Sequence, residues 1–394
     1  MSAASLTFPR SPARSRKISF DPVLTLSTST LLLIGLVMVT SASVSVAERS
    51  LNNPFYYFEH QLIFVLLGLA ACAIAVTIPM HIWERLAVPL MITAFAMLVL
   101  VLIPGIGHSV NGSRRWARLG FMNFQVSELA RVLLLIYLAG YAVRRQEELK
   151  TDIKGFLKPL GLLMVAALLL LIEPDFGAAT VLVATGLGIL FLAGVKFRHF
   201  LALVTLAVVG MSLIAVSSPY RVKRLIGFVD PWADPFNSGF QLTQSLIAIG
   251  RGEIFGVGLG ASVQKLFYLP EAHTDFVFAV LAEEFGLVGI VVTLALFVLL
   301  VWRSLHIARL AAEAGLRFQS YVAASFGLWV GLQTFVNVGV NMGLLPTKGL
   351  TLPLLSYGGS SLLVTLGWLG MVFRVAHETQ LSGRSAMPKK ERTP

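Results

Sequence analysis

The chain has little charge and almost no cysteine. Only 13% of its 394 residues are charged, against about a quarter in an ordinary soluble domain, whereas 56% are hydrophobic. The single cysteine, Cys72, excludes an intramolecular disulfide and a CxxC redox or metal motif. Acidic residues number 20 against 31 basic ones. This composition indicates an integral membrane protein whose basic residues flank the spans, and it argues against nucleic-acid binding.

Ten apolar segments approach the length of about 20 residues that a membrane-crossing helix needs. They cover residues 23–46, 60–79, 83–103, 127–143, 158–173, 177–195, 199–217, 276–302, 318–343 and 353–373. We therefore predict an all-α, polytopic membrane protein with ten transmembrane helices. The first apolar run is too long for the core of a signal peptide, so we expect an uncleaved span.

The distribution of basic residues predicts the orientation. With ten spans both chain ends lie on one side, and that side carries 20 Lys and Arg residues against 10 on the other. The positive-inside rule makes the richer side cytoplasmic. We predict disordered basic tails over residues 1–22 and 374–394 and a transmembrane domain over 23–373. Within that domain, residues 218–275 form a long, partly helical periplasmic loop that folds back on the membrane face.

The basic residues on the outer side are concentrated in two loops. Eight of the ten are Arg114, Arg115 and Arg118 in the loop 104–126, and Arg221, Lys223, Arg224, Arg251 and Lys265 in the loop 218–275. Long translocated loops escape the positive-inside rule, which accounts for the second group but not for the first. We expect an anion site here, with lipid phosphates as the nearest partners.

Two pairs of carboxylates at or inside predicted spans are candidates for a role. Glu173 and Asp175, in the short outer loop "EPDFG", are candidates to cap the helix that follows. Glu283 and Glu284 lie two turns into the eighth span. Ionisable groups inside a membrane are functional candidates by default.

Two further stretches predict local structure. In "QVSELAR", Ser127 is expected to cap a helix on which Glu128 pairs with Arg131, three residues later. "LLPTKGLTLPLLSYGGSS", residues 344–361, combines prolines and glycines with a lone Lys348. It predicts a broken or re-entrant helix whose non-helical backbone faces protein or a cavity.

The stretch "YLPEAHTDF" places Glu271, His273 and Asp275 at alternate positions before the apolar run that starts at Phe276. If the backbone is extended, the three side chains lie on one side and are candidates to bind a divalent cation, Mg²⁺ or Mn²⁺. Asp275 alone is either a helix N-cap or a group that takes part in chemistry.

Several motifs together resemble the SEDS family of polytopic bacterial membrane proteins over the whole transmembrane body. They are "YLPEAHTDFVFAVLAEEFG", "EPDFGAA", "NGSRRWARLG", "FQVSELAR" and "PTKGLTLPLLSYGGSSL". The last is more similar to the family's division members than to its elongation members. Val126 departs from the family, which usually has proline there.

The resemblance implies a peptidoglycan glycosyltransferase that polymerises lipid II into a nascent glycan strand. The reaction would take place at the outer face of the bacterial cytoplasmic (inner) membrane, at the division septum. A class B penicillin-binding transpeptidase and other divisome membrane proteins are the implied partners.

The resemblance also implies the site. Asp275 matches the family's essential acid, and Lys348 matches its outer lysine. The predicted diphosphate-binding residues are Arg114, Arg115, Arg118, Arg221, Arg224 and Lys348. The predicted supporting residues are Glu271, His273, Glu173, Asp175, Glu283, Ser356, Tyr357 and Gly358. No cofactor is expected beyond a divalent cation, for which Asp275 is the candidate ligand.

The chemistry agrees with this inventory. A polyprenyl diphosphate leaves without being protonated if cations meet its charge, so a single carboxylate suffices as general base, contributing roughly 10² to 10⁴ in rate. Two alternatives are a flippase for lipid-linked precursors and a scaffold that only recruits the transpeptidase. A flippase must also receive the headgroup from the cytoplasm, whereas the candidate residues lie on the outer side.

Overall fold

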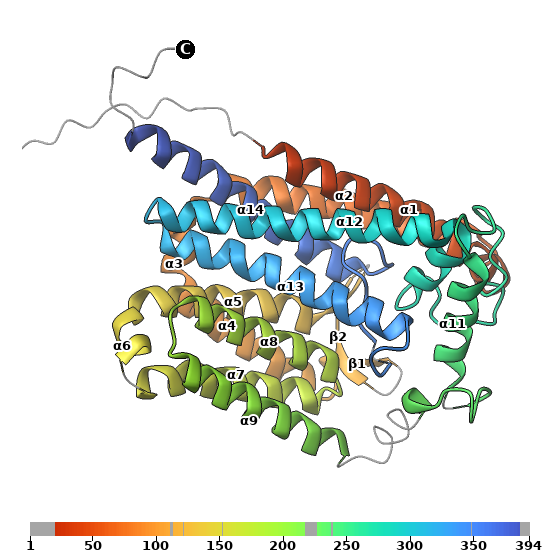
Figure 1. Ribbon diagram of the computed structural model, residues 1–394, viewed down its shortest axis with the longest axis horizontal. Coiled ribbons are helices and arrows are strands. Elements are labelled where there is room, and N and C mark those ends of the chain that lie inside the picture. Colours follow the sequence, from red (N-terminus) through yellow and green to blue (C-terminus); the bar gives the residue numbers. More distant parts are fainter. Residues whose placement is uncertain are drawn as a thin grey trace, which may run out of the picture.

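The computed structural model describes the chain from residue 20 to residue 386 with short gaps. The described residues are 20–110, 113–120, 122–151, 153–216, 227–237, 239–347 and 349–386. Most of the predicted N-terminal tail and the end of the C-terminal tail therefore lie outside them. Figure 1 shows a bundle whose long helices run along one direction.

Helices account for most of the described residues, and each of the ten predicted spans contains one. Their bounds are α1 Pro22–Leu51, α2 Tyr56–Thr77, α3 Met80–Arg85, α4 Ala87–Leu102, α5 Val126–Arg144, α6 Gln146–Thr151, α7 Ile153–Ile172, α8 Phe176–Leu192, α9 Phe197–Val216, α11 Phe240–Gly252, α12 Val277–Glu313, α13 Arg317–Asn341 and α14 Gly359–Ala386. The all-α prediction is confirmed.

Seven helices in the described part of the chain are long and apolar enough to cross a membrane, namely α1, α2, α5, α7, α12, α13 and α14. Helices α4 and α8 are apolar but shorter, at 16 and 17 residues, and α9 has 20 residues. This is the pattern of a multi-pass membrane protein. The count of ten crossings stays a prediction.

The largest differences from the predicted boundaries are in α12 and α14. Helix α12 has 37 residues, about 55 Å at 1.5 Å per residue, and therefore extends past a hydrocarbon core of about 30 Å. Helix α14 starts six residues later than predicted and continues to Ala386, into the predicted tail. Its late start follows from the backbone of Leu354, whose φ of 66° is left-handed and incompatible with a helix.

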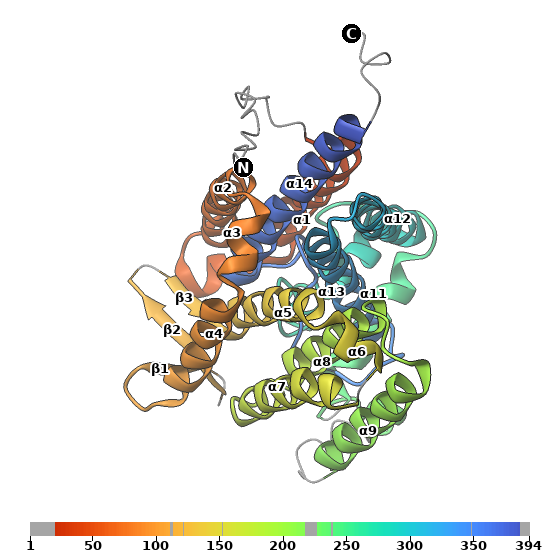
Figure 2. The same ribbon diagram turned by 90° about the vertical axis from the view of Figure 1, so that its left-hand side faces the viewer.

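The loop between α4 and α5 carries a small sheet that the sequence did not predict. Strands β1 (Gly107–Val110), β2 (Ser113–Leu119) and β3 (Met122–Gln125) pair antiparallel in the order β1-β2-β3. The sheet is a local hairpin structure at the edge of the bundle (Figure 2). It places Arg115 and Arg118 on one strand, β2.

Aromatic rings fill the centre of the bundle between α5, α13 and α14. The rings of Trp329 and Trp368 lie 5.3 Å apart, and Phe326 packs edge-on against Trp368. The Arg131 guanidinium lies 5.7 Å from the Trp329 ring and forms the predicted ion pair with Glu128. Figure 2 looks along the bundle and shows α5 and α13 at its centre.

The long loop is folded where the structure describes it. Helix α11 crosses the end of the bundle at a steep angle to the long helices (Figure 1). The Ser245 hydroxyl on α11 donates to the carbonyl of Asn341, the last residue of α13, at 2.8 Å. The prediction that this loop folds back on the bundle is therefore confirmed for its described residues, while residues 217–226 lie outside them.

Candidate active site

Asp275 lies in a turn, residues 271–276, that leads into α12. Two amides of α13 hold its backbone: Nδ2 of Asn337 donates to the Asp275 carbonyl at 2.9 Å, and Nδ2 of Asn341 donates to it at 3.1 Å. The carboxylate is half-buried and lies against Gly349, where a Cβ would be 3.2 Å from Asp275 Oδ2. The acid is therefore fixed by its main chain while its side chain contacts the loop that follows α13.

The N-cap alternative for Asp275 is wrong. Helix α12 begins at Val277, so Phe276 takes the cap position, and it makes no side-chain capping bond. The N–H of Ala279 instead donates to Oδ1 of Asn341 at 3.2 Å. A neighbouring helix therefore satisfies this first-turn amide.

A row of carboxamides on α13 connects the acid to the loop 344–358. Gln333, Asn337 and Asn341 are four residues apart and fully buried, so they share one face of the helix. Nδ2 of Asn337 also donates to the Leu350 carbonyl at 2.6 Å, and Nε2 of Gln333 donates to the Thr351 carbonyl at 2.9 Å. The sequence interpretation missed these residues, although amides at a spacing of four in an apolar helix are a detectable signal.

The loop 344–358 is non-helical in its described residues, as predicted for a broken helix, and its part from Leu350 to Ser356 is mostly buried. The side chains of Leu350, Leu352, Leu354 and Leu355 are all at most 4% exposed. Gly35 of α1 makes room for it, because a Cβ there would come within 2.5 Å of the Leu354 carbonyl oxygen. Lys348 lies outside the described residues.

The predicted supporting residues of this loop bind its own backbone and its neighbours. The Ser356 hydroxyl accepts from the N–H of Leu352 at 2.8 Å, and Nε2 of Gln61 donates to the Ser356 carbonyl at 3.1 Å. The Gly358 N–H lies 3.5 Å from Oε1 of Gln61. The Tyr357 N–H donates to the His273 carbonyl at 2.9 Å, which joins this loop to the turn that carries Asp275.

Glu271 and His273 do not converge with Asp275, because the stretch is a turn and the expected extended backbone is absent there. Glu271 has a φ of 56° and accepts from the Thr274 hydroxyl at 2.6 Å. The His273 ring packs on Tyr57, with centroids 4.5 Å apart, and burial lowers its pKa. Within the described residues no three His, Cys, Asp or Glu side chains are placed to hold a metal ion, so the three-residue cation site is not supported.

Asp175 caps α8, as predicted, and joins three other elements. Its Oδ1 accepts from the Ala178 N–H at 3.0 Å, and its Oδ2 lies 3.5 Å from Nη1 of Arg115 on β2. The Ser127 hydroxyl donates to the same Oδ2 at 3.1 Å. Ser127 is therefore not the cap of α5, which begins one residue earlier at Val126.

Glu173 does not cap a helix. Its side chain is fully buried, and neither carboxylate oxygen has a hydrogen-bond partner in the described structure. Burial raises its pKa to about 8; the nearby Asp175 adds to the shift and Arg115 opposes it. At neutral pH this group is mostly protonated, because an unpaired carboxylate is costly to bury.

The described basic residues differ in what they contact. Arg118 is exposed, with Nη2 3.4 Å from Nε2 of His108, whereas Arg115 is partly buried against Asp175. For Arg114 only the backbone, in β2, is described. Arg221, Lys223 and Arg224 lie outside the described residues, as does Lys348.

Glu283 is a buried anchor for the outer loop. Its carboxylate accepts four hydrogen bonds, from the Arg251 guanidinium at 3.0 Å, the Ser262 hydroxyl at 2.5 Å, the Val263 N–H at 3.1 Å and the Gln264 N–H at 3.4 Å. Four donors make a buried carboxylate tolerable in an apolar helix. These bonds hold the loop that precedes α12, and the supporting role predicted for Glu283 stays a prediction.

Glu284 pairs with Lys265 of the same loop. Their Oε1 and Nζ atoms are 2.7 Å apart, and the Ser41 hydroxyl of α1 donates to the same Oε1 at 2.7 Å. Arg251 and Lys265 were among the outer cations expected to favour an external anion. That expectation is wrong for these two residues, because carboxylates of this chain already neutralise them.

Helix α12 is interrupted at Gly286, whose φ and ψ are 63° and −158°. The segment between α11 and α12 forms four backbone hydrogen bonds with the residues on both sides of the break. The N–H groups of Val257 and Gly258 donate to the carbonyls of Glu283 and Glu284. The N–H groups of Leu287 and Val288 donate to the carbonyls of Glu253 and Ile254. Glycine is required, since a Cβ on Gly286 would lie 2.4 Å from the nitrogen of Gly256. The first piece of α12, residues 277–285, is thereby tied to the loop.

The chain resembles known proteins over nearly all of its length. A family model for FtsW, RodA and SpoVE, described as "Cell cycle protein", matches residues 22–381. A probable peptidoglycan glycosyltransferase FtsW from Thioalkalivibrio sulfidiphilus is 57% identical over 92% of this chain and 91% of the relative. A protein of the same name from Coxiella burnetii is 50% identical over 92% of this chain and 97% of the relative.

Solved structures give the same picture. A chain from a study titled "Structural coordination of polymerization and crosslinking by a peptidoglycan synthase complex" has a TM-score of 0.75 and 30% identity, covering 92% of this chain and 99% of that one. The rod shape determining protein RodA of Thermus thermophilus has a TM-score of 0.69 and 28% identity, covering 92% and 98%.

Proposed function

Because the chain belongs to the FtsW/RodA/SpoVE family of cell cycle proteins, we propose that it is a peptidoglycan glycosyltransferase that polymerises lipid II during septal cell-wall synthesis. The single observation that carries the proposal is the support of Asp275. The buried carboxamides of Asn337 and Asn341 donate hydrogen bonds to its carbonyl. Its half-buried carboxylate lies just before the start of α12, beside Gly349.

Asp275 acts as the general base in this proposal. A sugar 4-hydroxyl attacks the anomeric carbon of lipid II and gives its proton to the Asp275 carboxylate as the new C–O bond forms. The bond from the anomeric carbon to the polyprenyl diphosphate breaks, and the diphosphate leaves with the electron pair. The leaving group needs charge stabilisation and no proton, so one carboxylate is sufficient.

The cations of the outer loops stabilise the leaving diphosphate. Among the described residues Arg118 supports this role, because its side chain is exposed and carries no carboxylate partner. Arg115 is partly engaged by Asp175 at 3.5 Å, a distance at which a stronger anion can compete. Arg114, Arg221, Arg224 and Lys348 are proposed to add to this set on the strength of the sequence alone.

The proposed setting is the bacterial cytoplasmic membrane, with both chain ends in the cytoplasm. The similar solved chain comes from a peptidoglycan synthase complex that coordinates polymerisation and crosslinking, which supports a partner synthase for this protein as well. We assign that partner to the class B penicillin-binding transpeptidases, together with other divisome membrane proteins. Polymerisation at the outer face then delivers the strand on the side where it is crosslinked.

Purified protein with its transpeptidase partner and lipid II tests the proposal. Asp275→Asn is expected to lower the polymerisation rate by at least about a hundredfold, because the general base is lost while the size of the side chain is kept. Glu271→Gln is the matched control, since Glu271 is exposed in the same turn and its carboxylate accepts from the Thr274 hydroxyl. Copurification of the transpeptidase is expected to be unchanged in both variants.

The alternatives give different results in the same experiment. Full polymerase activity in Asp275→Asn would overturn the mechanism. A flippase would move lipid II between the leaflets of vesicles without lengthening glycan, and a scaffold would retain its partner and show no activity in the unchanged protein.

A further inference from the structure

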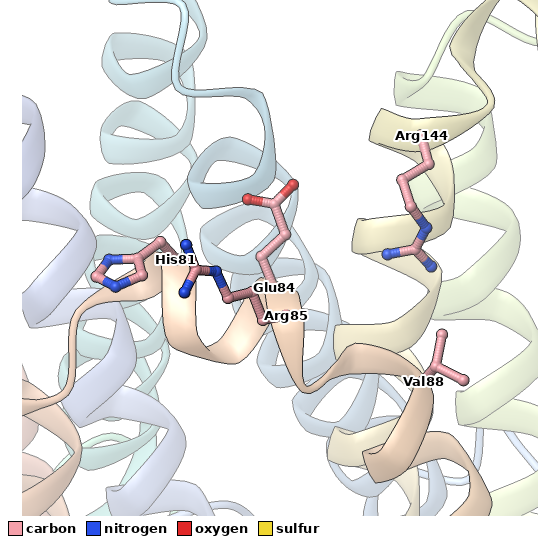
Figure 3. Close-up of a pocket in the computed structure, with 5 residues that line it drawn as sticks. All are labelled: His81, Glu84, Arg85, Val88 and Arg144. Atoms are coloured by element: carbon pink, nitrogen blue, oxygen red, sulfur yellow. The ribbon is translucent and has the colours of Figure 1, made fainter.

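A second site lies at the end of the bundle far from Asp275. A cavity of about 500 Å³ is lined by His81, Glu84 and Arg85 of α3, Val88 of α4 and Arg144 at the end of α5. Figure 3 shows these five side chains. Helices α3 and α6 lie at the end of the bundle where α14 terminates (Figure 1). This is the end predicted to face the cytoplasm, so the polymerase reaction does not use it.

Within the described residues, no carboxylate pairs with either guanidinium group in this cavity. Neighbouring acids at this end of the bundle are already engaged, in the ion pairs Arg374–Glu378, Arg145–Glu148 and Lys150–Glu147. Across the described residues, Arg85 and Arg144 form no hydrogen bond or ion pair with an acid, Glu84 included. Arg85 and Arg144 lie on different helices and line the same cavity, so the cavity is suited to bind an anion.

Arg144 is held over the cavity by the local shape of α5. Its Nη1 lies 2.9 Å from the place where a Cβ on Gly140 would be, so the absence of a side chain there lets the guanidinium fold back along the helix. The same guanidinium lies 5.9 Å from the Tyr137 ring. In Figure 3 the side chain points toward Val88 of α4.

An apolar stripe continues from the cavity along α4. Val88, Ile92 and Val99 are 43%, 59% and 48% exposed, and their spacing places them on one face of the helix. A charged pocket that opens onto an exposed apolar stripe has the chemistry of a phospholipid, with its headgroup in the pocket and an acyl chain on the stripe.

We propose that this cavity binds the phosphodiester headgroup of a phospholipid from the cytoplasmic leaflet. Arg85 and Arg144 donate to the phosphate oxygens from two sides, as guanidinium groups commonly do. Glu84, in the same cavity, offers an acceptor to the hydroxyl or ammonium group of the headgroup. The bound lipid would bridge α3 and α5, which approach one another here.

Native mass spectrometry of the purified protein tests this proposal. The protein, freed of lipid in detergent, is titrated with phosphatidylglycerol and separately with phosphatidylethanolamine. We expect one tightly held phospholipid on the unchanged protein, and an affinity at least about tenfold lower for the double variant R85Q/R144Q. Arg145→Gln is the matched control, because Arg145 is the next residue in sequence and is already paired with Glu148.

Each other outcome would overturn the proposal. Equal lipid binding by the unchanged protein and the double variant would show that the two arginines hold no headgroup. An equal loss in Arg145→Gln would assign the effect to surface charge in general. Thermal stabilisation by inorganic phosphate without a difference in lipid binding would show that the pocket takes the free anion.

Discussion

At the scale of single residues, the candidate site depends on neutral amides more than on charges. Asn337 donates to two carbonyl oxygens that are 75 positions apart in the chain, those of Asp275 and Leu350. A carbonyl left without a donor in a buried site costs about 1–3 kcal/mol. Asn337 therefore contributes to fixing the position of the acid relative to the loop 344–358, together with Asn341 and the backbone bond from Tyr357 to His273.

Asn337→Ala is expected to reduce polymerisation of lipid II by at least about tenfold, because the acid and the loop lose their shared donor. The measurement is the rate of glycan synthesis by purified protein, together with its thermal midpoint. Gln319→Ala is the control: Gln319 lies at the other end of α13 and donates to Glu378 at 3.1 Å. Equal rates in the two variants would contradict the role assigned to Asn337.

Glu173 predicts a dependence of stability on pH. Its pKa in the folded protein, about 8, is higher than the value of 4.5 for a free side chain, so the folded state holds the proton more tightly. The stability linked to this group is therefore complete below about pH 4.5 and is lost as the pH rises through about 8, by on the order of a few kcal/mol.

Glu173→Gln removes that dependence. The difference in thermal midpoint between the variant and the unchanged protein is expected to grow in favour of the variant from pH 5 to pH 8.5, in about the range where Glu173 ionises. Scans in detergent at several pH values measure it. A difference that is constant across this range would show that Glu173 does not titrate there.

At the scale of elements, the break in α12 organises the end of the molecule where α11 lies (Figure 1). Before Gly286 nearly every side chain of α12 is buried, and after it exposed and buried side chains alternate with the helical period. The first piece is thus enclosed by the loop that supplies its missing hydrogen bonds. Three glycines, Gly252, Gly256 and Gly286, allow the two backbones to approach this closely.

Gly286→Ala is expected to destabilise the fold and to lower activity more than 10-fold, since a left-handed φ and a contact of 2.4 Å both oppose a Cβ. Gly331→Ala on α13 is the control. A Cβ there would meet Val301 at 3.6 Å, an ordinary contact, and alanine favours a helix by about 1 kcal/mol over glycine. Similar thermal midpoints for the two variants would show that glycine is not required at the break in α12.

At the scale of the whole molecule, hydropathy predicted the helices but not all of their ends. Apolar length alone placed a helix in each of ten segments, because the backbone in lipid has no other partner. It could not locate the start of α14, which depends on the left-handed Leu354, or the sheet at 107–125. Both depend on local backbone conformation that hydrophobicity does not encode.

Candidate site residues that belong to sequence motifs could be predicted, whereas contacts between distant segments could not. Asp275 and the helix-capping Asp175 were identified from their motifs, and the structure places Asp175 at the start of α8. The partners of Glu283 and Glu284 were not predictable, because Arg251, Ser262 and Lys265 reach them only after the loop has folded. The spacing of Gln333, Asn337 and Asn341 indicates a shared helix face, but it does not show which distant carbonyl groups they bind.

The orientation of the whole molecule is testable with single cysteines. In a Cys72→Ala background, Phe255→Cys at the outer loop is expected to react with a membrane-impermeant maleimide in spheroplasts, since Phe255 is 82% exposed. Arg309→Cys, whose arginine side chain is 78% exposed at the other end of α12, is expected to react only after permeabilisation. The reverse pattern would place the acid in the cytosol and exclude the proposed function.

The backbone of Asp275 is held by asparagine side chains, and this affects how glycan synthesis depends on pH. Carboxamides carry the same hydrogen atoms at every physiological pH, so the grip of Asn337 and Asn341 on the main chain is constant while the carboxylate gains or loses its proton. A pH profile of glycan synthesis therefore includes no loss of these two hydrogen bonds, whatever the protonation state of the carboxylate.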